Sequence, residues 1–227
     1  MQDSSRDQTV ATTCALLDLQ CYHGTGLNEI VRASGSPKGS LYYYFPGGKE
    51  ALTEEALEHE GGIVRERIAR HYAEAHGVDV APGRVLLTSG ASAGLVAVFA
   101  ALFAPGDRIG LARPGYPAYR NALKAPGRTA VEIDCGADVN YRLRPSMLDA
   151  LADPLAGLIV ASPANPTGAM LSRDELGALV ERCRRDRTRI VSAESYHGVR
   201  YGMSATTVLG PDPDATVLNR LSKLFRI

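Results

Sequence analysis

The sequence predicts an α/β fold, in which helices flank a mostly parallel sheet, preceded by a small all-α unit with a helix-turn-helix. Short apolar runs such as GLIVAS alternate with helical stretches such as SRDELGALVERCRRD, a pattern typical of a parallel sheet covered on both faces. Before Glu60, by contrast, helical stretches follow one another across tight turns. We therefore expect two domains, a helix-turn-helix over 1–60 and an α/β domain over 61–227.

Composition and charge also indicate a globular chain in two parts. Of its 227 residues, 45% are hydrophobic and 22% are charged, which is ordinary for a folded protein. The formal net charge is zero, but residues 1–60 hold four Lys/Arg and nine Asp/Glu, a balance of −5, whereas residues 61–227 hold 21 and 16, a balance of +5. Such an asymmetry indicates two units of different origin.

The first part is predicted to form four helices, over 8–21, 26–34, 38–45 and 49–60. Val10, Cys14 and Leu17 recur at helical spacing in the first of them, and YHGTG ends it. Thr25 is expected to cap the second helix, and Ser36 to cap the third, which has a proline in its first turn. Helices joined by a tight turn in this way form the helix-turn-helix pattern.

From Gly61 onward, predicted strands and helices alternate. The apolar runs predict strands over 84–89, 107–112, 129–134, 157–162, 189–194 and 216–222. The helical stretches cover 62–77, 92–103, 116–125, 144–152 and 172–186. Because helices separate successive strands, the strands are expected to run parallel.

The cysteines and the apolar runs bear on the cellular setting. The four cysteines, at positions 14, 21, 135 and 183, show no spacing typical of a metal site, and no metal is expected. Cys14 and Cys21 lie seven residues apart on one helix face, which favours core packing over a ligand or disulfide role. No apolar run approaches the roughly 18 residues that a membrane span needs, and no leader pattern opens the chain. We therefore expect a reduced, cytoplasmic setting without membrane contact.

The stretch GTGLNEIVRASGSPKGSLYYYFPGGKEAL resembles the N-terminal helix-turn-helix of TetR-family repressors, over about residues 6–60. In that family the third helix enters the major groove of DNA, and the resemblance implies two sets of contacts. Base edges would be approached by Ser36, Lys38, Gly39 and Ser40, and phosphates would be contacted by Tyr42, Tyr43 and Lys49. The alternative is a helical cap without DNA affinity. It is favoured by the acidic balance of this part, because duplex binding depends on neutralised phosphates.

Five blocks in the second part occur in a fixed order: LLTSGAS, PGYPAY, SPANPTG, SAESYHG and NRLSK. Together they resemble the large domain of class I/II aminotransferases, which use pyridoxal 5′-phosphate in the fold-type I arrangement. The resemblance covers about residues 62–227 and implies an incomplete large domain of that fold. It also implies an amino acid or 2-oxo acid as the small-molecule partner and a homodimer that completes each site.

The same resemblance implies a role for one or more residues in each block. The backbone N–H groups of Gly90, Ala91 and Ser92 would open a helix that stabilises the cofactor phosphate. Tyr116 would stack on the pyridine ring, and Asn165 and Tyr196 would reach the phenolic oxygen. Lys223 would bond to the cofactor aldehyde and then move a proton. Prolines and a glycine around Asn165 predict a rigid turn that presents its amide without reorientation.

The sequence departs from the family pattern at three places. Ala193 stands where the family has the aspartate that keeps the pyridine nitrogen protonated, and Glu194 is expected to point to the opposite face of the strand. Arg220 stands where the family has a phosphate-contacting serine, and it either reaches the phosphate or clashes. The sequence stops at Ile227, four residues past Lys223, before the family's phosphate-binding and carboxylate-binding arginines. The missing strands would leave an apolar sheet edge that needs covering.

Three functions follow from these observations. The first is a pyridoxal-phosphate-binding protein, with amino-group transfer between an amino acid and a 2-oxo acid if it is active. The second is a transcriptional regulator that joins a DNA-reading head to an aminotransferase-like domain. The third is a fused or truncated product with neither activity, favoured by Ala193 and the abrupt junction near Glu60.

Overall fold

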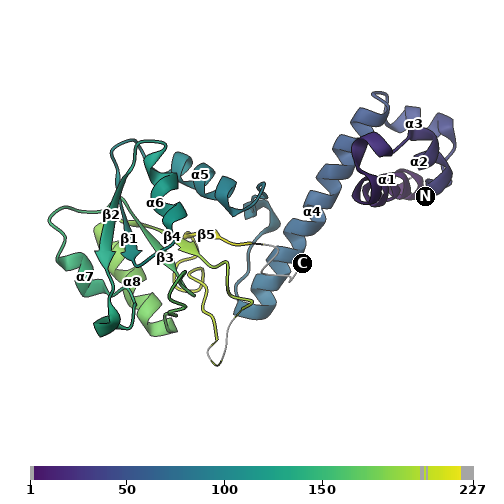
Figure 1. The fold of residues 1–227 in the computed structure, drawn as a ribbon. Helices are drawn as coiled ribbons and strands as arrows, with labels where there is room; N and C mark the ends of the chain where they lie inside the picture. The colour runs from purple at the N-terminus through teal and green to yellow at the C-terminus, as the bar shows by residue number, and fades with distance from the viewer. Residues whose placement is uncertain (1–2, 200–201, 203, 221–227) are drawn as a thin grey trace. The chain divides into compact units, whose positions relative to one another are not determined.

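A computed structural model describes residues 3–199, 202 and 204–220 of the chain (Figure 1). The chain divides into two compact units. The first runs from the N-terminal residues to Ala73 and includes Asp79–Leu86, and the second comprises Glu74–Val78 and the described residues from Leu87 onward. Within the described residues, none of the helices combines the length and apolar character required to cross a bilayer.

The first unit is helical, as the sequence predicts. Its helices are α1 (Asp3–Gly24), α2 (Leu27–Ser34), α3 (Lys38–Tyr44) and most of α4 (Lys49–His76). The short connections put the apolar faces of these helices together around one core, formed mainly by Val10, Cys14, Ile30, Leu41, Phe45, Leu52 and Ala56. Burial of large side chains such as Phe45, which is 2% exposed, is the main stabilising contribution of this unit.

Four local expectations for this unit are wrong. α4 is one helix where the sequence predicts two, over 49–60 and 62–77, because strong helix formers flank the Gly61–Gly62 pair and outweigh its propensity cost. Cys21 is exposed, since the backbone of α1 kinks at this residue. The hydroxyls of Thr25 and Ser36 cap no helix; Gly26 and Pro37 are the N-cap residues of α2 and α3.

The second unit is built on a five-stranded parallel sheet, which confirms the predicted α/β fold. The strands are β1 (Arg108–Arg113), β2 (Thr129–Asp134), β3 (Gly157–Ala161), β4 (Arg189–Ala193) and β5 (Thr216–Leu218), in the spatial order β2-β1-β3-β4-β5. The helices are α5 (Ala91–Leu102), α6 (Pro117–Lys124), α7 (Pro145–Asp149) and α8 (Arg173–Asp186), with short 3₁₀ turns at Pro82–Arg84 and Ala137–Val139. α5 and α6 lie on one side of the sheet, and α7 and α8 lie on the other (Figure 1).

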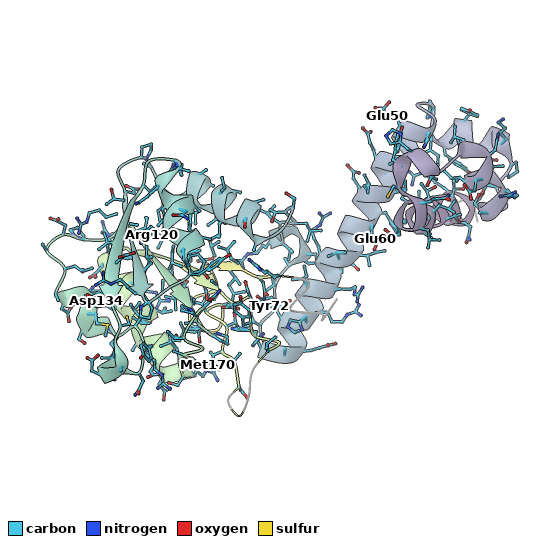
Figure 2. All side chains as sticks on the ribbon, in the orientation of Figure 1. Glu50, Glu60, Tyr72, Arg120, Asp134 and Met170 are labelled. Carbon is cyan, nitrogen blue, oxygen red and sulfur yellow. The ribbon has the colours of Figure 1, made fainter. Side chains whose placement is uncertain are left out.

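One hydrophobic cluster of this unit lies between the sheet and the α5–α6 layer. It contains Leu95, Phe99, Phe103, Ile109, Leu111, Leu123, Ile159, Val191 and Leu218. Side chains fill the space between the helices and the strands, so the layers are in direct contact (Figure 2). A Cβ atom at Gly157 would lie 2.4 Å from the Phe103 ring, so β3 must begin with a glycine for that ring to pack against it.

The segment 84–89 is not a strand, which corrects the prediction from RVLLTS. Arg84 ends a 3₁₀ turn, and residues 85–88 form neither helix nor strand. A strand requires a neighbour that accepts and donates its backbone hydrogen bonds. In the described residues the sheet ends at β5 without another strand beyond it. Leu86 is 88% exposed.

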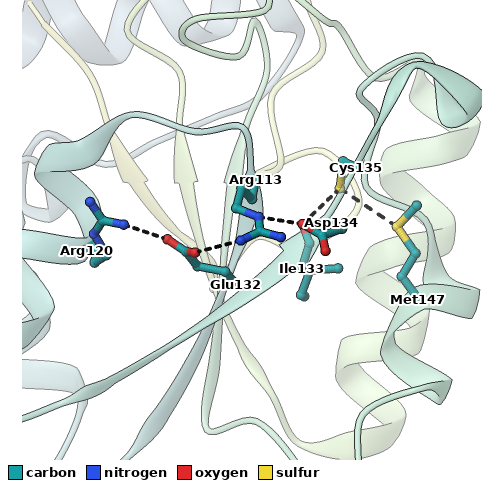
Figure 3. Close-up of polar contacts among 7 residues, drawn as sticks. All are labelled: Arg113, Arg120, Glu132, Ile133, Asp134, Cys135 and Met147. Carbon is teal, nitrogen blue, oxygen red and sulfur yellow. Dashed lines mark hydrogen bonds and ion pairs between the residues drawn. The ribbon is translucent and has the colours of Figure 1, made fainter.

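The opposite edge of the sheet, β2, is lined by charged side chains (Figure 3). The Arg113 Nε of β1 lies 2.5 Å from Asp134 Oδ1, and the Arg120 guanidinium of α6 lies 3.0 Å from Glu132 Oε1. Exposed pairs of this kind contribute little stability individually. Charges along an edge strand do disfavour pairing with a second sheet, so we infer that they protect this edge.

α8 begins with a capping box, which allows a test of its contribution to stability. Ser172 Oγ accepts the N–H of Glu175 at 3.2 Å, and the Ser172 N–H donates to Glu175 Oε2 at 2.8 Å. Replacing Ser172 by alanine is expected to lower the free energy of unfolding of this unit by about 1 kcal/mol. Urea titration of the variant against wild type measures this difference, and an unchanged midpoint would contradict it.

The second half of the capping box predicts a pH dependence. The Ser172 backbone N–H is the main group that lowers the pKa of Glu175. Because the folded-state pKa is lowered, the carboxylate stabilises the fold fully above its unfolded pKa, about 4.3, and this contribution is lost as the pH falls through the folded value. The stability advantage of wild type over Glu175→Gln should therefore be present at pH 7 and shrink below about pH 4. If wild type is more stable than Glu175→Gln by the same amount at both pH values, the Glu175 carboxylate is not stabilised by the Ser172 N–H as stated.

Candidate functional site

The carboxyl ends of the strands carry the residues singled out by the sequence. A pocket with about 350 Å³ of empty space opens there, beside β4 and β5. It is lined by Ala91, Leu95, Tyr116, Tyr119, Asn165, Ala193, Ser195, Tyr196, Leu218 and Arg220. Four of the predicted cofactor-binding residues, one from each of the first four blocks, therefore meet in one pocket.

Asn165 and Tyr196 lie next to each other in this pocket. Asn165 Nδ2 donates to the Tyr196 hydroxyl oxygen at 3.5 Å, although 31 residues separate the two in the chain. The turn that carries Asn165 is tied internally, because the Ala164 N–H donates to the Ala169 carbonyl and the Gly168 N–H donates to the Ala164 carbonyl. Gly168 has a φ of 70°, a left-handed conformation that glycine adopts without strain.

The start of α5 forms another wall of the pocket. Gly90 precedes the helix with a φ of 82°, and Ala91 and Ser92 form its first turn. The first N–H groups of a helix have no partner within it and carry a partial positive charge. A phosphate placed there would accept hydrogen bonds from this first turn.

An aromatic pair lies beside the start of α6. Tyr116 is the N-cap residue of α6, and its ring meets the ring of Tyr119 edge-on, with the centroids 5.5 Å apart. Burial raises the pKa of Tyr119 to about 12, so its hydroxyl is neutral and able to donate at physiological pH. Sequence reasoning missed Tyr119. Its spacing of three residues from Tyr116, one helical turn, is the signal that could have identified it.

Ala193 presents a methyl group to the pocket where the resemblance leads one to expect a carboxylate. It is the last residue of β4 and is 4% exposed. Glu194 does not replace that carboxylate, because its Oε1 accepts hydrogen bonds from Ser192, Thr207 and Val208. Glu194 shares its face with Ser192 two residues earlier, as the expected alternation of side chains requires.

The fifth block, NRLSK, contributes Arg220 and contains Lys223. Arg220 lines the pocket, and its backbone N–H donates to Asn219 Oδ1 at 2.8 Å. Lys223 lies outside the described residues. Among the residues that are described, no group of His, Cys, Asp and Glu side chains has the arrangement of a metal site.

A second opening lies where the chain reverses direction across the sheet. β1 is followed by β2 on one side and, after α7, by β3 on the other, and ligands often bind at such a switch point. This opening has about 530 Å³ of empty space and a mostly apolar lining. Tyr119 and Asn165 line both openings, so the two adjoin.

The predicted DNA-contacting residues fall into two groups in the first unit. Lys38, Gly39, Tyr42 and Tyr43 are exposed along α3, and Ser40 is half-buried. Ser36 is only 6% exposed, and its hydroxyl lies 2.8 Å from the Thr9 hydroxyl, so it is oriented into the unit.

Lys49 lies at the start of α4 and is held by α1. Its Nζ donates to the Tyr22 carbonyl at 2.5 Å and lies 4.1 Å from the centre of the Tyr22 ring.

Comparison with known proteins identifies relatives of both units. The profile of the family "Aminotransferase class I and II" matches residues 63–226, and that of "Bacterial regulatory proteins, tetR family" matches residues 10–56. The valine–pyruvate aminotransferase of Mycobacterium tuberculosis is 40% identical over 164 residues, covering 71% of this chain and 42% of that protein. The HTH-type transcriptional regulator LmrA of Bacillus subtilis is 51% identical over 65 residues, covering 29% of this chain and 35% of LmrA.

The likeness extends to solved structures. A crystal structure of an aminotransferase from Mycobacterium tuberculosis, 40% identical, matches with a TM-score of 0.68 over 71% of this chain and 42% of that chain. The alanine aminotransferase of Pyrococcus furiosus, 25% identical, matches with a TM-score of 0.65 over 71% of this chain and 42% of that chain. This chain thus spans less than half the length of these relatives. It belongs to the class I and II aminotransferase family and carries a TetR-family helix-turn-helix at its N-terminal end.

Proposed function

We propose that residues 61–227 bind pyridoxal 5′-phosphate in the pocket between the starts of α5 and α6 and the end of β4. The observation that carries this proposal is the approach of Asn165 Nδ2 to the Tyr196 hydroxyl, 3.5 Å apart, in a pocket that also contains the start of α5. Two polar groups at one end and free helix N–H groups at another suit a ligand with a phenolic oxygen and a phosphate. The family membership of the chain supports the same ligand.

Each residue of the pocket would have a separate task. Pyridoxal 5′-phosphate, when bound, supplies a ring that accepts electrons from a substrate carbon. Ala91 and Ser92 would hold the phosphate through their N–H groups, and Tyr116 would cover one face of the ring. Asn165 and Tyr196 would donate to the phenolic oxygen.

Lys223 would hold the aldehyde through its Nζ atom. Once an amino acid displaces it, the same nitrogen would carry the proton of the substrate α-carbon.

Ala193 limits the chemistry that this pocket supports. Among the described residues of the lining there is no carboxylate to hold a proton on the ring nitrogen, and loss of such an electrostatic contact costs on the order of 3 kcal/mol of transition-state stabilisation. We therefore propose cofactor binding, with slow amino-group transfer between an amino acid and a 2-oxo acid. A cytoplasmic setting and a homodimer are part of the same proposal.

Covalent retention of the cofactor tests this function. Purified protein with added pyridoxal 5′-phosphate should gain absorbance near the edge of the visible range. Reduction with borohydride should then leave a mass increase on the peptide that contains Lys223. Lys223→Ala should abolish the mass increase, whereas Lys124→Ala, on α6, should leave it unchanged. Wild type that shows neither absorbance nor a mass increase would refute the proposal.

As a second function, we propose that residues 1–60 bind DNA. The observation in favour is the exposure of Lys38 and of two adjacent tyrosines of α3, of which Tyr42 is 47% and Tyr43 is 78% exposed. Exposed aromatic hydroxyls and a lysine at the start of a helix are suited to phosphate oxygens. The acidic balance of this part predicts weak binding, because few phosphates are neutralised.

A gel shift at low salt tests the second function. Lys38→Ala and Tyr43→Phe should weaken the shift caused by promoter DNA, because the first removes a contact to a base edge and the second a contact to a phosphate of the duplex. His59→Ala, an exposed residue of α4, serves as the control and should behave like wild type. If wild type shifts no DNA at low ionic strength, residues 1–60 are a helical cap.

A further inference from the structure

A buried polar cluster lies beside the candidate pocket without lining it. Glu194 is 1% exposed and His197 is 3% exposed, and they flank Tyr196 in the sequence. A buried carboxylate is costly unless several donors surround it. Glu194 Oε1 meets that condition, with the Ser192 and Thr207 hydroxyls at 3.0 and 3.1 Å and the Val208 N–H at 2.9 Å.

His197 extends this cluster to the neighbouring strand. Its Nε2 lies 3.0 Å from the carbonyl oxygen of Ser162, and because a carbonyl can only accept, this nitrogen carries a proton. The Nδ1 atom on the other side of the ring lies 3.6 Å from Glu194 Oε2. His197 thus links the end of β4 to the first residue after β3.

Ser162 is the first residue of the turn that presents Asn165. Its hydroxyl accepts the N–H of Leu171 at 3.0 Å, so one residue joins both ends of the segment 162–171. The imidazole of His197 is attached to this same residue. The two segments that carry Asn165 and Tyr196 are therefore connected through buried groups outside the pocket.

We propose that Glu194 and His197 are positioning residues that hold the Asn165 and Tyr196 segments at one separation before any ligand binds. The carboxylate ties residues 207–208 to the end of β4, and the imidazole ties that end to Ser162. A site held in this way binds its ligand without an additional ordering cost. The ligand itself, pyridoxal 5′-phosphate, rests on the proposed function above, but the connection between the segments does not.

Hydrogen–deuterium exchange of the full chain without cofactor tests the connection directly. His197→Ala should raise the exchange rate of the peptide 162–171 by about tenfold. This is the effect expected when one buried hydrogen bond is lost. Peptides from β1 and β2 should exchange as in wild type. His197→Gln keeps a donor near the Nε2 position and should restore most of the protection, whereas His197→Asn is too short to reach Ser162 and should not.

If His197→Ala does not fold, the exchange of the peptide 162–171 is compared between His197→Gln and His197→Asn instead. His59→Ala, which removes an exposed imidazole from α4, is the matched control. Equal exchange of 162–171 in all His197 variants and wild type would overturn the proposal. So would an equal rise in every peptide of the second unit, because that would show a role in overall stability alone.

Cofactor affinity provides the second measurement. Titration with pyridoxal 5′-phosphate should show binding weakened about tenfold in His197→Ala and Glu194→Ala and mostly restored in His197→Gln. If wild type does not bind pyridoxal 5′-phosphate, the proposed function is refuted. The hydrogen–deuterium exchange of the variants then still tests whether His197 connects the two segments. Tight binding by His197→Ala together with raised exchange would show that the connection does not position the site, and would overturn the proposal.

Discussion

Ala193→Asp is expected to accelerate exchange of the substrate α-proton by about 10²–10³-fold in the presence of pyridoxal 5′-phosphate. Ala193 lines the pocket at the end of β4 and is 4% exposed, so an aspartate there would lie within it. Its carboxylate would hold a proton on the ring nitrogen at this buried position, where such a contact is stronger than in water. The rate is measured by NMR as loss of the α-proton signal of an amino acid in deuterated buffer.

Ala193→Asn is the matched control for this substitution. It has nearly the same shape as aspartate but carries no charge, so it should leave the exchange rate close to that of wild type. Without cofactor, the buried aspartate should destabilise the second unit by about 1–3 kcal/mol, and added cofactor should reverse this loss. Equal exchange rates in the aspartate and asparagine variants would contradict the role given to this position.

Phe99→Ala is expected to lower the free energy of unfolding of the second unit by about 3–5 kcal/mol. Phe99, a residue of α5, is 0% exposed. Its side chain lies in the core, with its ring centroid 6.3 Å from that of Phe103. Truncation removes the transfer free energy of the ring and leaves a cavity that the parallel sheet cannot close. Because α5 also provides the start of the pocket at Ala91, cofactor binding should weaken as well.

Urea unfolding followed by circular dichroism measures the effect of Phe99→Ala. The loss belongs to the second unit, so amide exchange in α1–α3 should remain that of wild type. Val96→Ala is the control on the same helix; its side chain is 50% exposed, and its change should stay within about 0.5 kcal/mol. A loss under about 1 kcal/mol for Phe99→Ala would show that α5 is not anchored by this ring.

Helices and strands with a strong local pattern were predicted well. The strand over 129–134 has the predicted bounds, and the helix predicted over 172–186 is α8, Arg173–Asp186. These elements depend on periodicity and on residues a few positions apart, which the sequence displays directly. The predicted pocket residues Ala91, Tyr116, Asn165 and Tyr196 meet for a related reason, because the carboxyl ends of parallel strands share one edge of a sheet.

Predictions that depended on distant partners were less successful. The run RVLLTS has strand composition, yet a strand also needs a neighbour, and the described sheet ends before supplying one. Ser36 has the residue type of a cap, but its hydroxyl is directed to Thr9, 27 residues earlier in the chain. Cys21 has the spacing of a core residue and becomes exposed where α1 kinks.

The sequence by itself determined the family, the order of the elements and the chemical groups available to the site, because motifs and hydrophobic periodicity are local properties. Only the tertiary structure decided that His197 bonds to Ser162, 35 residues away, and that Glu194 is enclosed by groups from the segment at 207–208. It also decided that a methyl group at position 193 lines the pocket. These facts depend on which buried surfaces come together, and a buried polar group is satisfied only by the partners that the folded chain brings to it.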